Sequence, residues 1–437
     1  MTLAVSYAKR AWLGLFASLL ICVGGWHWAE TILVPGNTLA AQSNRVPVGN
    51  NSDLYPRWFG ARELLRHHKD PYSAEVTRGI QKGFYGRELD PQDPVDPSDQ
   101  AGFAYPLYVV FILAPTISLP FSAVQAFAGW FMLAAIAASV PLWMYAMGFR
   151  SRWQWMLAGM VLAISSYPAV LEFHMQNLAA FVALLLALAA AAAAANSLFV
   201  CGVLLALSTI KPQLSGLFVL WFLLWTLTKW RERKRVAIGF GAAMFALAGG
   251  AELVQSRWIP EFFAAIREYG IYATDPSLVE FIFGPILGDV IAVGLCCCLV
   301  FIVWRWRWSA AGSADFGWAL AWTASVTLAI IPVAVYNQVL LSPAFLVLLL
   351  DWNHFSGVFP RGLAKAAILC QGWQWITAML IGICAFVITP EQLRFLMRVP
   401  FATLIALPAV VLLAIAATTV LSRGVRITPQ IAVARHE

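Results

Sequence analysis

The residues of this chain that could do chemistry are a few ionisable and amide side chains at the edges of long apolar stretches. They are Asp53, Glu172, His174, Gln176, Asn177, Lys211, Asn337 and Gln338. Ionisable groups at or near membrane depth are costly, so each one is a functional candidate. A carboxylate can take the proton of an attacking hydroxyl group. Lysine and histidine can stabilise the charge that develops on a leaving phosphate.

Asp53 heads a segment with the pattern of an amphipathic helix. Residues 50–52 (Asn-Asn-Ser) are of types that cap helices, and Phe59, Leu64 and Leu65 form an apolar stripe at helical spacing. We expect this helix to lie on the membrane surface. The Asp53 carboxylate would then either cap the helix or serve as a general base held at that surface.

The next candidates form one cluster between two apolar stretches. Glu172, His174, Gln176 and Asn177 fall within six residues of one another. A single histidine in such a place is more often a satisfied polar residue. Two titratable and two amide side chains together predict a site of substrate contact.

Two further positions carry polar groups into the apolar scaffold. Lys211 ends an apolar stretch directly before Pro212, which interrupts a helix. Its ammonium group would either reach the membrane interface or hold a phosphate as a point charge. Asn337 and Gln338 belong to a polar patch between two later apolar stretches, where their amides could bind sugar hydroxyl groups.

The composition of the chain places these residues on a membrane scaffold. Of 437 residues, 61% are hydrophobic and 12% are charged, whereas soluble domains are about 45–50% apolar and about 25% charged. The mean hydropathy of +0.74 covers the whole length. The sequence therefore predicts an all-α integral membrane protein with a single polytopic domain over residues 1–437.

The same composition argues against several classes of function. The net charge of +7 is spread between apolar stretches, and membrane topology explains it more simply than nucleic-acid binding does. The seven cysteines lie in apolar stretches without metal-ligand spacing. No nucleotide-binding or soluble-hydrolase motif is present, and we expect neither a metal nor a cofactor.

Twelve apolar stretches are candidate membrane spans, although several are short for a bilayer. They are 11–34, 122–148, 154–171, 177–195, 198–211, 214–229, 236–255, 282–304, 316–336, 338–351, 366–388 and 400–422. A long loop, 35–121, follows the first of them. Its segment 104–120 is apolar but holds three prolines, so we expect it to be interfacial or re-entrant rather than spanning.

Basic residues predict the orientation of these spans, because short cytoplasmic loops are rich in lysine and arginine. If 104–120 does not cross, every compact basic cluster falls on one side. The clusters are Lys9/Arg10, Arg150/Arg152, Lys229 to Arg235, Arg305/Arg307, Arg361/Lys365 and Arg423/Arg426. Both termini are then cytoplasmic in a bacterial cytoplasmic (inner) membrane, and the candidate residues share the extracytoplasmic face.

The order of these motifs resembles a known family. The motifs are Ser-Asp-Leu-Tyr at 52–55, Phe-Ala-Tyr-Pro-Leu at 103–107, Gln-Asn at 176–177 and Ile-Lys-Pro-Gln at 210–213. Together they resemble the polytopic glycosyltransferases of the C superfamily, most closely family 87, the polyprenyl-phosphate-mannose-dependent mannosyltransferases. The resemblance covers about residues 1–230, and the rest of the chain matches only in hydropathy. The family's paired prolines are a single Pro106 here, and its late extracytoplasmic signature is replaced by residues 336–338.

This resemblance implies transfer of a hexose, mannose in the family, from a polyprenyl-phosphate donor to a lipid or glycan acceptor on the extracytoplasmic face. It places the family's acidic residue at Asp53, here the general base of an inverting reaction. Tyr105 joins the substrate-contact candidates through its motif. Two alternatives remain: a transporter or flippase for a polyprenyl-linked or other anionic lipid, and a glycan ligase or polymerase. The second alternative would be expected to carry a large late loop.

Overall fold

A computed structural model describes residues 2–36, 38, 49–90, 93, 96–272, 275–355, 357–389, 392, 396 and 404–421. Within these ranges the chain is helical and has no strand; a lone antiparallel bridge joins Ser277 to Pro332. The prediction of an all-α protein is confirmed for this part of the chain.

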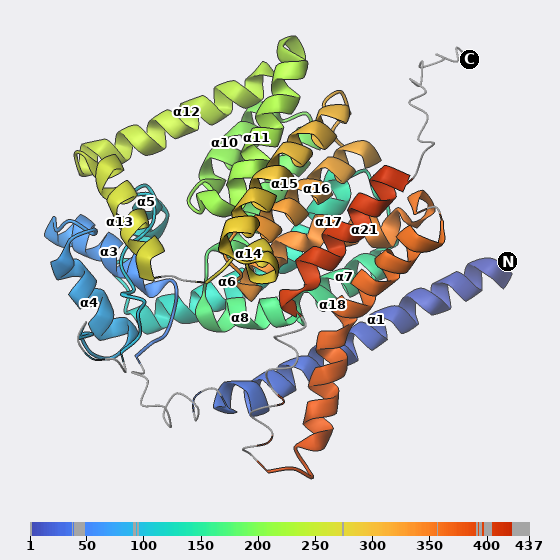
Figure 1. Ribbon diagram of the computed structural model, residues 1–437, viewed down its shortest axis with the longest axis horizontal. Coiled ribbons are helices and arrows are strands. Elements are labelled where there is room, and N and C mark those ends of the chain that lie inside the picture. Colours follow the sequence, from blue (N-terminus) through green and yellow to red (C-terminus); the bar gives the residue numbers. More distant parts are fainter. Residues whose placement is uncertain are drawn as a thin grey trace.

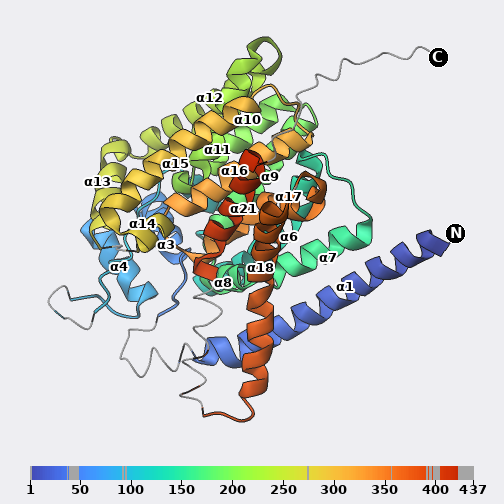
Figure 2. The same ribbon diagram turned by 45° about the vertical axis from the view of Figure 1, so that its right-hand side comes forward.

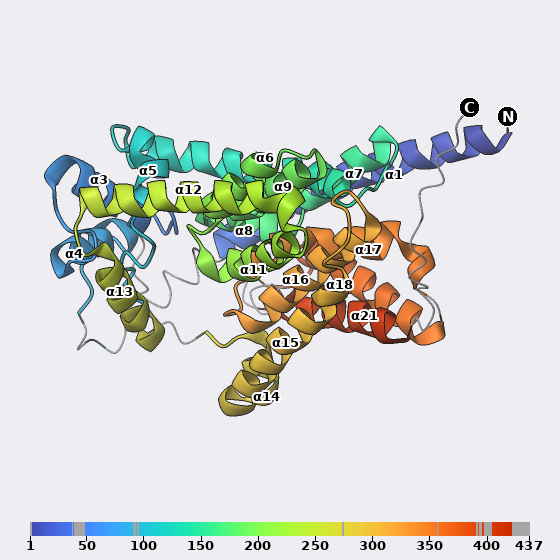
Figure 3. The same ribbon diagram turned by 90° about the horizontal axis from the view of Figure 1, so that it is seen from above.

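The longest helices form the frame of the molecule. They are α1 (Thr2–Trp28), α6 (Phe121–Ala146), α12 (Trp230–Val254), α15 (Pro285–Arg305) and α18 (Val358–Cys384). In Figure 3, α6 and α12 run along the long direction of the molecule. Helix α18 crosses α1 and packs on it, as Figure 2 shows.

Shorter helices fill the space between these long ones. They are α7 (Trp153–Ile164), α8 (Tyr167–Met175), α9 (Ala179–Ala194), α10 (Leu198–Ser208), α11 (Pro212–Thr228), α16 (Ala314–Ile330), α17 (Ser342–Leu350) and α21 (Leu407–Leu421). The alanine-rich α9 is almost wholly buried and packs against α6 and α10. Small side chains allow this close approach, which is how helices associate in a bilayer.

A helix forms in each of the twelve predicted apolar stretches. Among the residues that the structure describes, five helices are long and apolar enough to cross a membrane, or six if α7 and α8, bent by 57° at their junction, form one span. The others are shorter, so the count of twelve crossings stays a prediction. The stretch 400–422 is described only from 404 to 421, and the cluster Arg423/Arg426 lies outside the described residues, as do Met1 and residues 422–437.

The first loop folds as a cap at one end of the bundle. Its elements are α3 (Tyr55–His67), α4 (Ala74–Phe84), the short α5 (Val109–Leu113) and the 3-10 turn η2 (Ala114–Thr116). They gather at the left of Figure 1 with α13 (Trp258–Tyr272), while α14 (Leu278–Phe283) lies nearer the centre. Segment 104–120 therefore contains one short helix and a turn rather than a continuous spanning helix.

The elements that carry the described basic clusters lie along the top and right of Figure 1, away from the cap at the left: the start of α1, the α6–α7 and α11–α12 connections, the end of α15 and the start of α18. Three contacts link the segments around these clusters. The ring centroids of Trp12 and Trp153 are 5.2 Å apart. Gly312 N–H donates to the Ala146 carbonyl at 3.0 Å, and Arg233 Nη1 donates to the Arg307 carbonyl at 3.1 Å. We call this part of the bundle the basic end, and the end with α3, α4, α5 and α13 the cap end.

Candidate functional site

A chain of hydrogen bonds joins four of the predicted residues, although they come from four separate parts of the sequence. Asn177 Nδ2 donates to Asp53 Oδ2 at 2.7 Å. Lys211 Nζ donates to Asn177 Oδ1 at 2.7 Å and to Asn337 Oδ1 at 2.8 Å. We call Asp53, Asn177, Lys211 and Asn337 the site network.

Local backbone structure explains how Asp53 and Asn177 meet. Helix α8 ends at Gln176, which adopts a left-handed conformation with φ of 48°. The chain therefore reverses before α9, and Asn177 Oδ1 also accepts the backbone N–H of Ala179 at 3.0 Å. On the other side, Asp53 N–H donates to the Met175 carbonyl at 2.7 Å. This backbone bond fixes the first loop against the end of α8.

The interpretation of the Asp53 carboxylate as a helix cap is wrong. Helix α3 begins at Tyr55, and its N-cap residue, Leu54, makes no side-chain cap. The Asp53 carboxylate lies before the helix and accepts from Asn177 instead. Of the two roles considered for Asp53, the capping role is thereby excluded.

Lys211 and Asn337 join the network from later parts of the chain. Lys211 directly precedes α11, where Pro212 occupies the first helical position. Asn337 lies in the 3-10 helix η3 (Val335–Leu341). Lys211, Asn177 and Asn337 are each no more than 5% exposed. A buried ammonium group requires such partners, since an unpaired charge would be costly to bury.

The polarity of the network follows from its lysine. An ammonium group can only donate, so both amides must present their oxygen atoms to Lys211. Asn177 is then left with its NH2 group toward Asp53 and must donate there. Among the described residues, none donates a hydrogen bond to the other carboxylate oxygen, Oδ1. The network therefore presents Asp53 as a proton acceptor.

Glu172 adds a second carboxylate beside the network. It is fully buried on α8, and its Oε1 accepts the backbone N–H of Ala180 at 3.2 Å. Its Oε2 is buried without a hydrogen-bond partner. Lys211 and Asp53 both interact with it electrostatically. Glu172 thus lies in the electrostatic surroundings of Lys211 and Asp53 and makes no hydrogen bond to the network.

Besides Glu172 and Tyr105, three predicted residues lie outside the network. His174 Nε2 lies 3.1 Å from Glu30 Oε1 of the π-helical turn η1 (Ala29–Leu33), without hydrogen-bond alignment. Gln176 Oε1 accepts from Gln125 Nε2 at 3.2 Å. Gln338 Nε2 donates to the Leu404 carbonyl at 2.6 Å, and its Oε1 has no partner.

Sequence reasoning missed Arg57, which lies one helical turn after Asp53. Its Nη1 donates to the Asp53 carbonyl at 2.6 Å, and its guanidinium lies 4.2 Å from the centre of the Tyr105 ring. Tyr105 is itself fixed, because its carbonyl accepts the Tyr72 hydroxyl at 2.7 Å. The signal in the sequence was a basic residue four positions after Asp53, close enough for its side chain to reach back to the Asp53 carbonyl.

Tyrosines complete the surroundings of the site. Lys211 Nζ lies 5.0 Å from the centre of the Tyr336 ring. Tyr269 of α13 interacts electrostatically with both Arg57 and Asp53. The sequence did not point to Tyr269, whereas Tyr336 adjoins the predicted polar residues Asn337 and Gln338. The site is thus bordered by aromatic rings with hydroxyl groups, which suit a sugar.

A third carboxylate, Asp99, lies in the first loop near the same arginine. Burial raises the pKa of Asp99 above its ordinary value. The backbone N–H of Ala101, which donates to Asp99 Oδ1 at 2.8 Å, and the charge of Arg57 both oppose this rise, while the charge of Asp53 adds to it. The electrostatics of the cap end are therefore coupled between Asp53, Arg57 and Asp99.

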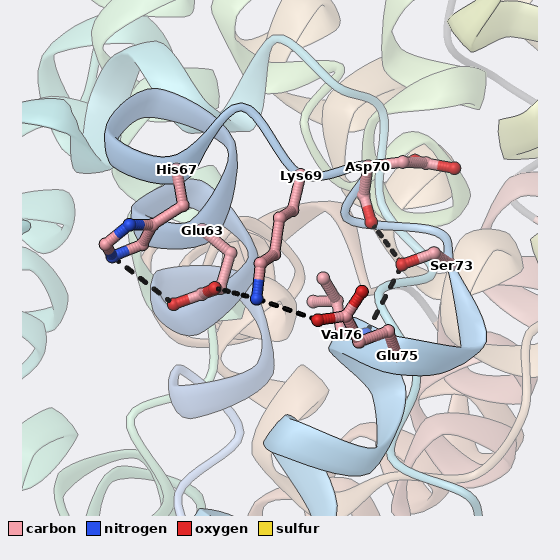
Figure 4. Close-up of polar contacts among 7 residues, drawn as sticks. All are labelled: Glu63, His67, Lys69, Asp70, Ser73, Glu75 and Val76. Carbon is pink, nitrogen blue, oxygen red and sulfur yellow. Dashed lines mark hydrogen bonds and ion pairs between the residues drawn. The ribbon is translucent and has the colours of Figure 1, made fainter.

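A separate polar cluster fastens α3 to α4, as Figure 4 shows. Lys69 Nζ lies 2.8 Å from Glu75 Oε1 and 3.6 Å from Glu63 Oε2. Ser73 caps α4 by accepting the Val76 N–H at 3.3 Å. The hydrogen bond from Lys69 lowers the pKa of Glu75. Lys69 and Glu75 are exposed, while Glu63 and Val76 are largely buried. The cluster shares no residue with the site network, so we assign it to the packing of the cap.

Comparison of the chain with protein-family models, with curated proteins and with solved structures finds no match.

Proposed function

We propose that this protein is an integral-membrane glycosyltransferase that moves a hexose, by the family resemblance mannose, from a polyprenyl phosphate to a lipid or glycan acceptor. The observation that carries the proposal is the hydrogen bond from Asn177 to Asp53, oriented by the buried Lys211. It holds a carboxylate as a proton acceptor at one end of an apolar helical bundle. A lipid-linked donor would reach such a site directly from the bilayer.

The chemistry is a single displacement at the anomeric carbon of the sugar. The Asp53 carboxylate takes the proton of the acceptor hydroxyl as its oxygen bonds to that carbon. The bond from the anomeric carbon to the phosphate oxygen breaks, and its electron pair leaves with the polyprenyl phosphate. Asp53 then releases its proton to water. One displacement inverts the configuration at the anomeric carbon.

The distribution of charge supports an extracytoplasmic site. The described basic clusters lie at the basic end, while Asp53 directly precedes α3 at the cap end. If the basic end is cytoplasmic, as the positive-inside rule predicts, the network faces the outside of a bacterial cytoplasmic membrane. The proposed twelve crossings, with both termini cytoplasmic, are consistent with this orientation.

The alternative function is a transporter or flippase for an anionic lipid, and buried ionisable residues are the observation that favours it. Lys211 and Glu172 are both nearly or fully buried, and buried ionisable groups often mark transport pathways. Transfer from the donor distinguishes the two functions, because a transporter moves its lipid without breaking the bond between sugar and phosphate.

The test is transfer of labelled mannose from a synthetic polyprenyl-phosphate mannose to bacterial lipid extract by the purified protein. Asp53→Asn can still accept from Asn177 and should fold normally, yet lose activity by about 10²–10⁴-fold. Asp289→Asn, an exposed carboxylate on α15, is the matched control and should keep full activity. Undiminished transfer by Asp53→Asn would refute the assignment of the base. Absence of transfer by the wild type, together with donor-lipid movement in vesicles, would establish the transporter instead.

A further inference from the structure

We propose that Arg57, rather than Lys211, binds the phosphate group of the lipid-linked donor. This inference rests on the proposed function and names the residue that recognises the phosphate. Sequence reasoning placed that role on Lys211 and His174. The positions of the donors in the structure favour a different residue.

Lys211 is already occupied within the protein. Its Nζ donates to Asn177 and to Asn337, and the residue is 4% exposed. Two of its three N–H donors are therefore used. A phosphate bound there would have to compete with the bond that orients Asn177, and through it Asp53. Lys211 is better described as a positioning residue that acts through Asn177.

Arg57 has the donors that Lys211 lacks. Its Nη1 is held by the Asp53 carbonyl, but its Nε is buried without a hydrogen-bond partner. A buried donor without an acceptor is unfavourable unless a ligand supplies that acceptor. Stacking on Tyr105 at 4.2 Å fixes the plane of the guanidinium. One edge of a planar, permanently charged group is thus left available.

Phosphate suits this arrangement chemically. A guanidinium edge can donate two parallel hydrogen bonds to two phosphate oxygens, which an ammonium group cannot do. As the bond between sugar and phosphate breaks, the phosphate changes from a monoanion to a dianion. The hydrogen bonds from Arg57 would strengthen as that charge develops, and interactions that are stronger in the transition state speed the reaction.

The position of Arg57 also fits the geometry of the transfer. Arg57 lies one helical turn beyond the Asp53 base, and the hydrogen bond between them ties the two residues together. The sugar would lie between the carboxylate and the guanidinium. Tyr105, Tyr269 and Tyr336 interact electrostatically with Arg57, as do Asp53, Asp99 and Lys211. The tyrosine hydroxyls could bind the remaining phosphate or sugar oxygens.

The test measures binding rather than activity, in the Asp53→Asn background so that no turnover occurs. The probe is farnesyl phosphate, compared with farnesol and with inorganic phosphate, by titration calorimetry in detergent. Arg57→Gln should weaken farnesyl phosphate binding at least tenfold and leave farnesol binding unchanged. Arg57→Lys should be intermediate, because it keeps the charge but loses the planar edge.

Arg62→Gln is the matched control. Arg62 is on the same helix and also has a buried Nε without a partner, but its guanidinium lies over Trp58 at 5.4 Å. We expect it to bind farnesyl phosphate as the parent does. The assignment is overturned if Arg57→Gln binds normally, if Arg62→Gln or Lys211→Met alone loses the phosphate-dependent affinity, or if inorganic phosphate binds as tightly as farnesyl phosphate.

The two proposals can fail separately. Loss of phosphate-dependent binding in Arg57→Gln, with transfer retained by Asp53→Asn, would keep the phosphate site and refute the base. Loss of transfer in Asp53→Asn, with normal farnesyl phosphate binding in Arg57→Gln, would keep the base and refute the phosphate site.

Discussion

Asn177 Nδ2 donates to Asp53 Oδ2 at 2.7 Å, across 124 residues of sequence. The same asparagine accepts from Lys211 at 2.7 Å and from the Ala179 backbone at 3.0 Å. One amide therefore connects the buried ammonium, the start of α9 and the carboxylate. Its orientation is not free, since reversing the amide would set its NH2 group against the ammonium of Lys211.

Replacing Asn177 should impair catalysis more than it impairs folding. Asn177→Ala removes a hydrogen bond to a charged group, worth about 1.5–3 kcal/mol, so kcat should fall about 10–100-fold. Asn177→Asp should be worse, because a carboxylate cannot donate to Asp53 and repels it. The measurement is initial transfer rate at saturating donor. Asn353→Ala, exposed near the basic end, is the control; equal losses in both variants would argue against the network.

Lys211→Met should lower kcat while leaving the donor KM within about twofold. Methionine removes the donor of Asn337 Oδ1, a penalty of about 1–3 kcal/mol, and leaves Asn177 Oδ1 with the Ala179 backbone N–H alone, so the amide of Asn177 is held less firmly. A direct phosphate ligand would behave differently, because its loss would raise KM as well. An increase of tenfold or more in the donor KM would indicate that Lys211 itself binds the phosphate.

Gly202 should be intolerant of any side chain. A Cβ atom there would overlap the Val236 carbonyl of α12, and one on Gly239 would overlap the Phe199 carbonyl of α10. Gly202→Ala should therefore lower the free energy of unfolding by about 1–3 kcal/mol, as measured by unfolding in mixed detergent. Gly241→Ala, which would meet no atom within 4 Å, should be neutral. Equal stability of both variants would contradict the close packing of α10 on α12.

Asp99→Asn should change how stability depends on pH. Because the folded protein raises the pKa of Asp99, the carboxyl binds its proton more tightly in the folded than in the unfolded state. Its ionisation therefore costs stability, a cost that is absent below the unfolded pKa and complete above the folded one. Asparagine can still accept the Ala101 N–H. We expect a Tm higher than wild type by about 1–2 °C at pH 7 and no difference at acidic pH. A lower Tm at pH 7 would contradict the inferred shift.

Much of the fold could be predicted from sequence because it depends on local composition. Each of the twelve apolar stretches contains a helix, as runs of apolar residues with few charges should. The amphipathic pattern after Asp53 likewise gave α3. The sequence did not determine how α3 begins, because a polar residue before a helix can either cap that helix or bind a residue elsewhere in the chain. At Asp53 the partner was Asn177, which lies on another helix connection.

Sequence alone determined which residues were candidates, because charge is scarce on an apolar chain and each ionisable group stands out. The sequence also placed Asp53 in the first loop. Only the tertiary structure decided which candidates work together. It joined Asp53, Asn177, Lys211 and Asn337, left His174 beside Glu30, and placed Arg57 at the site. The physical reason is that helix packing, and not chain proximity, sets which buried polar groups must satisfy one another.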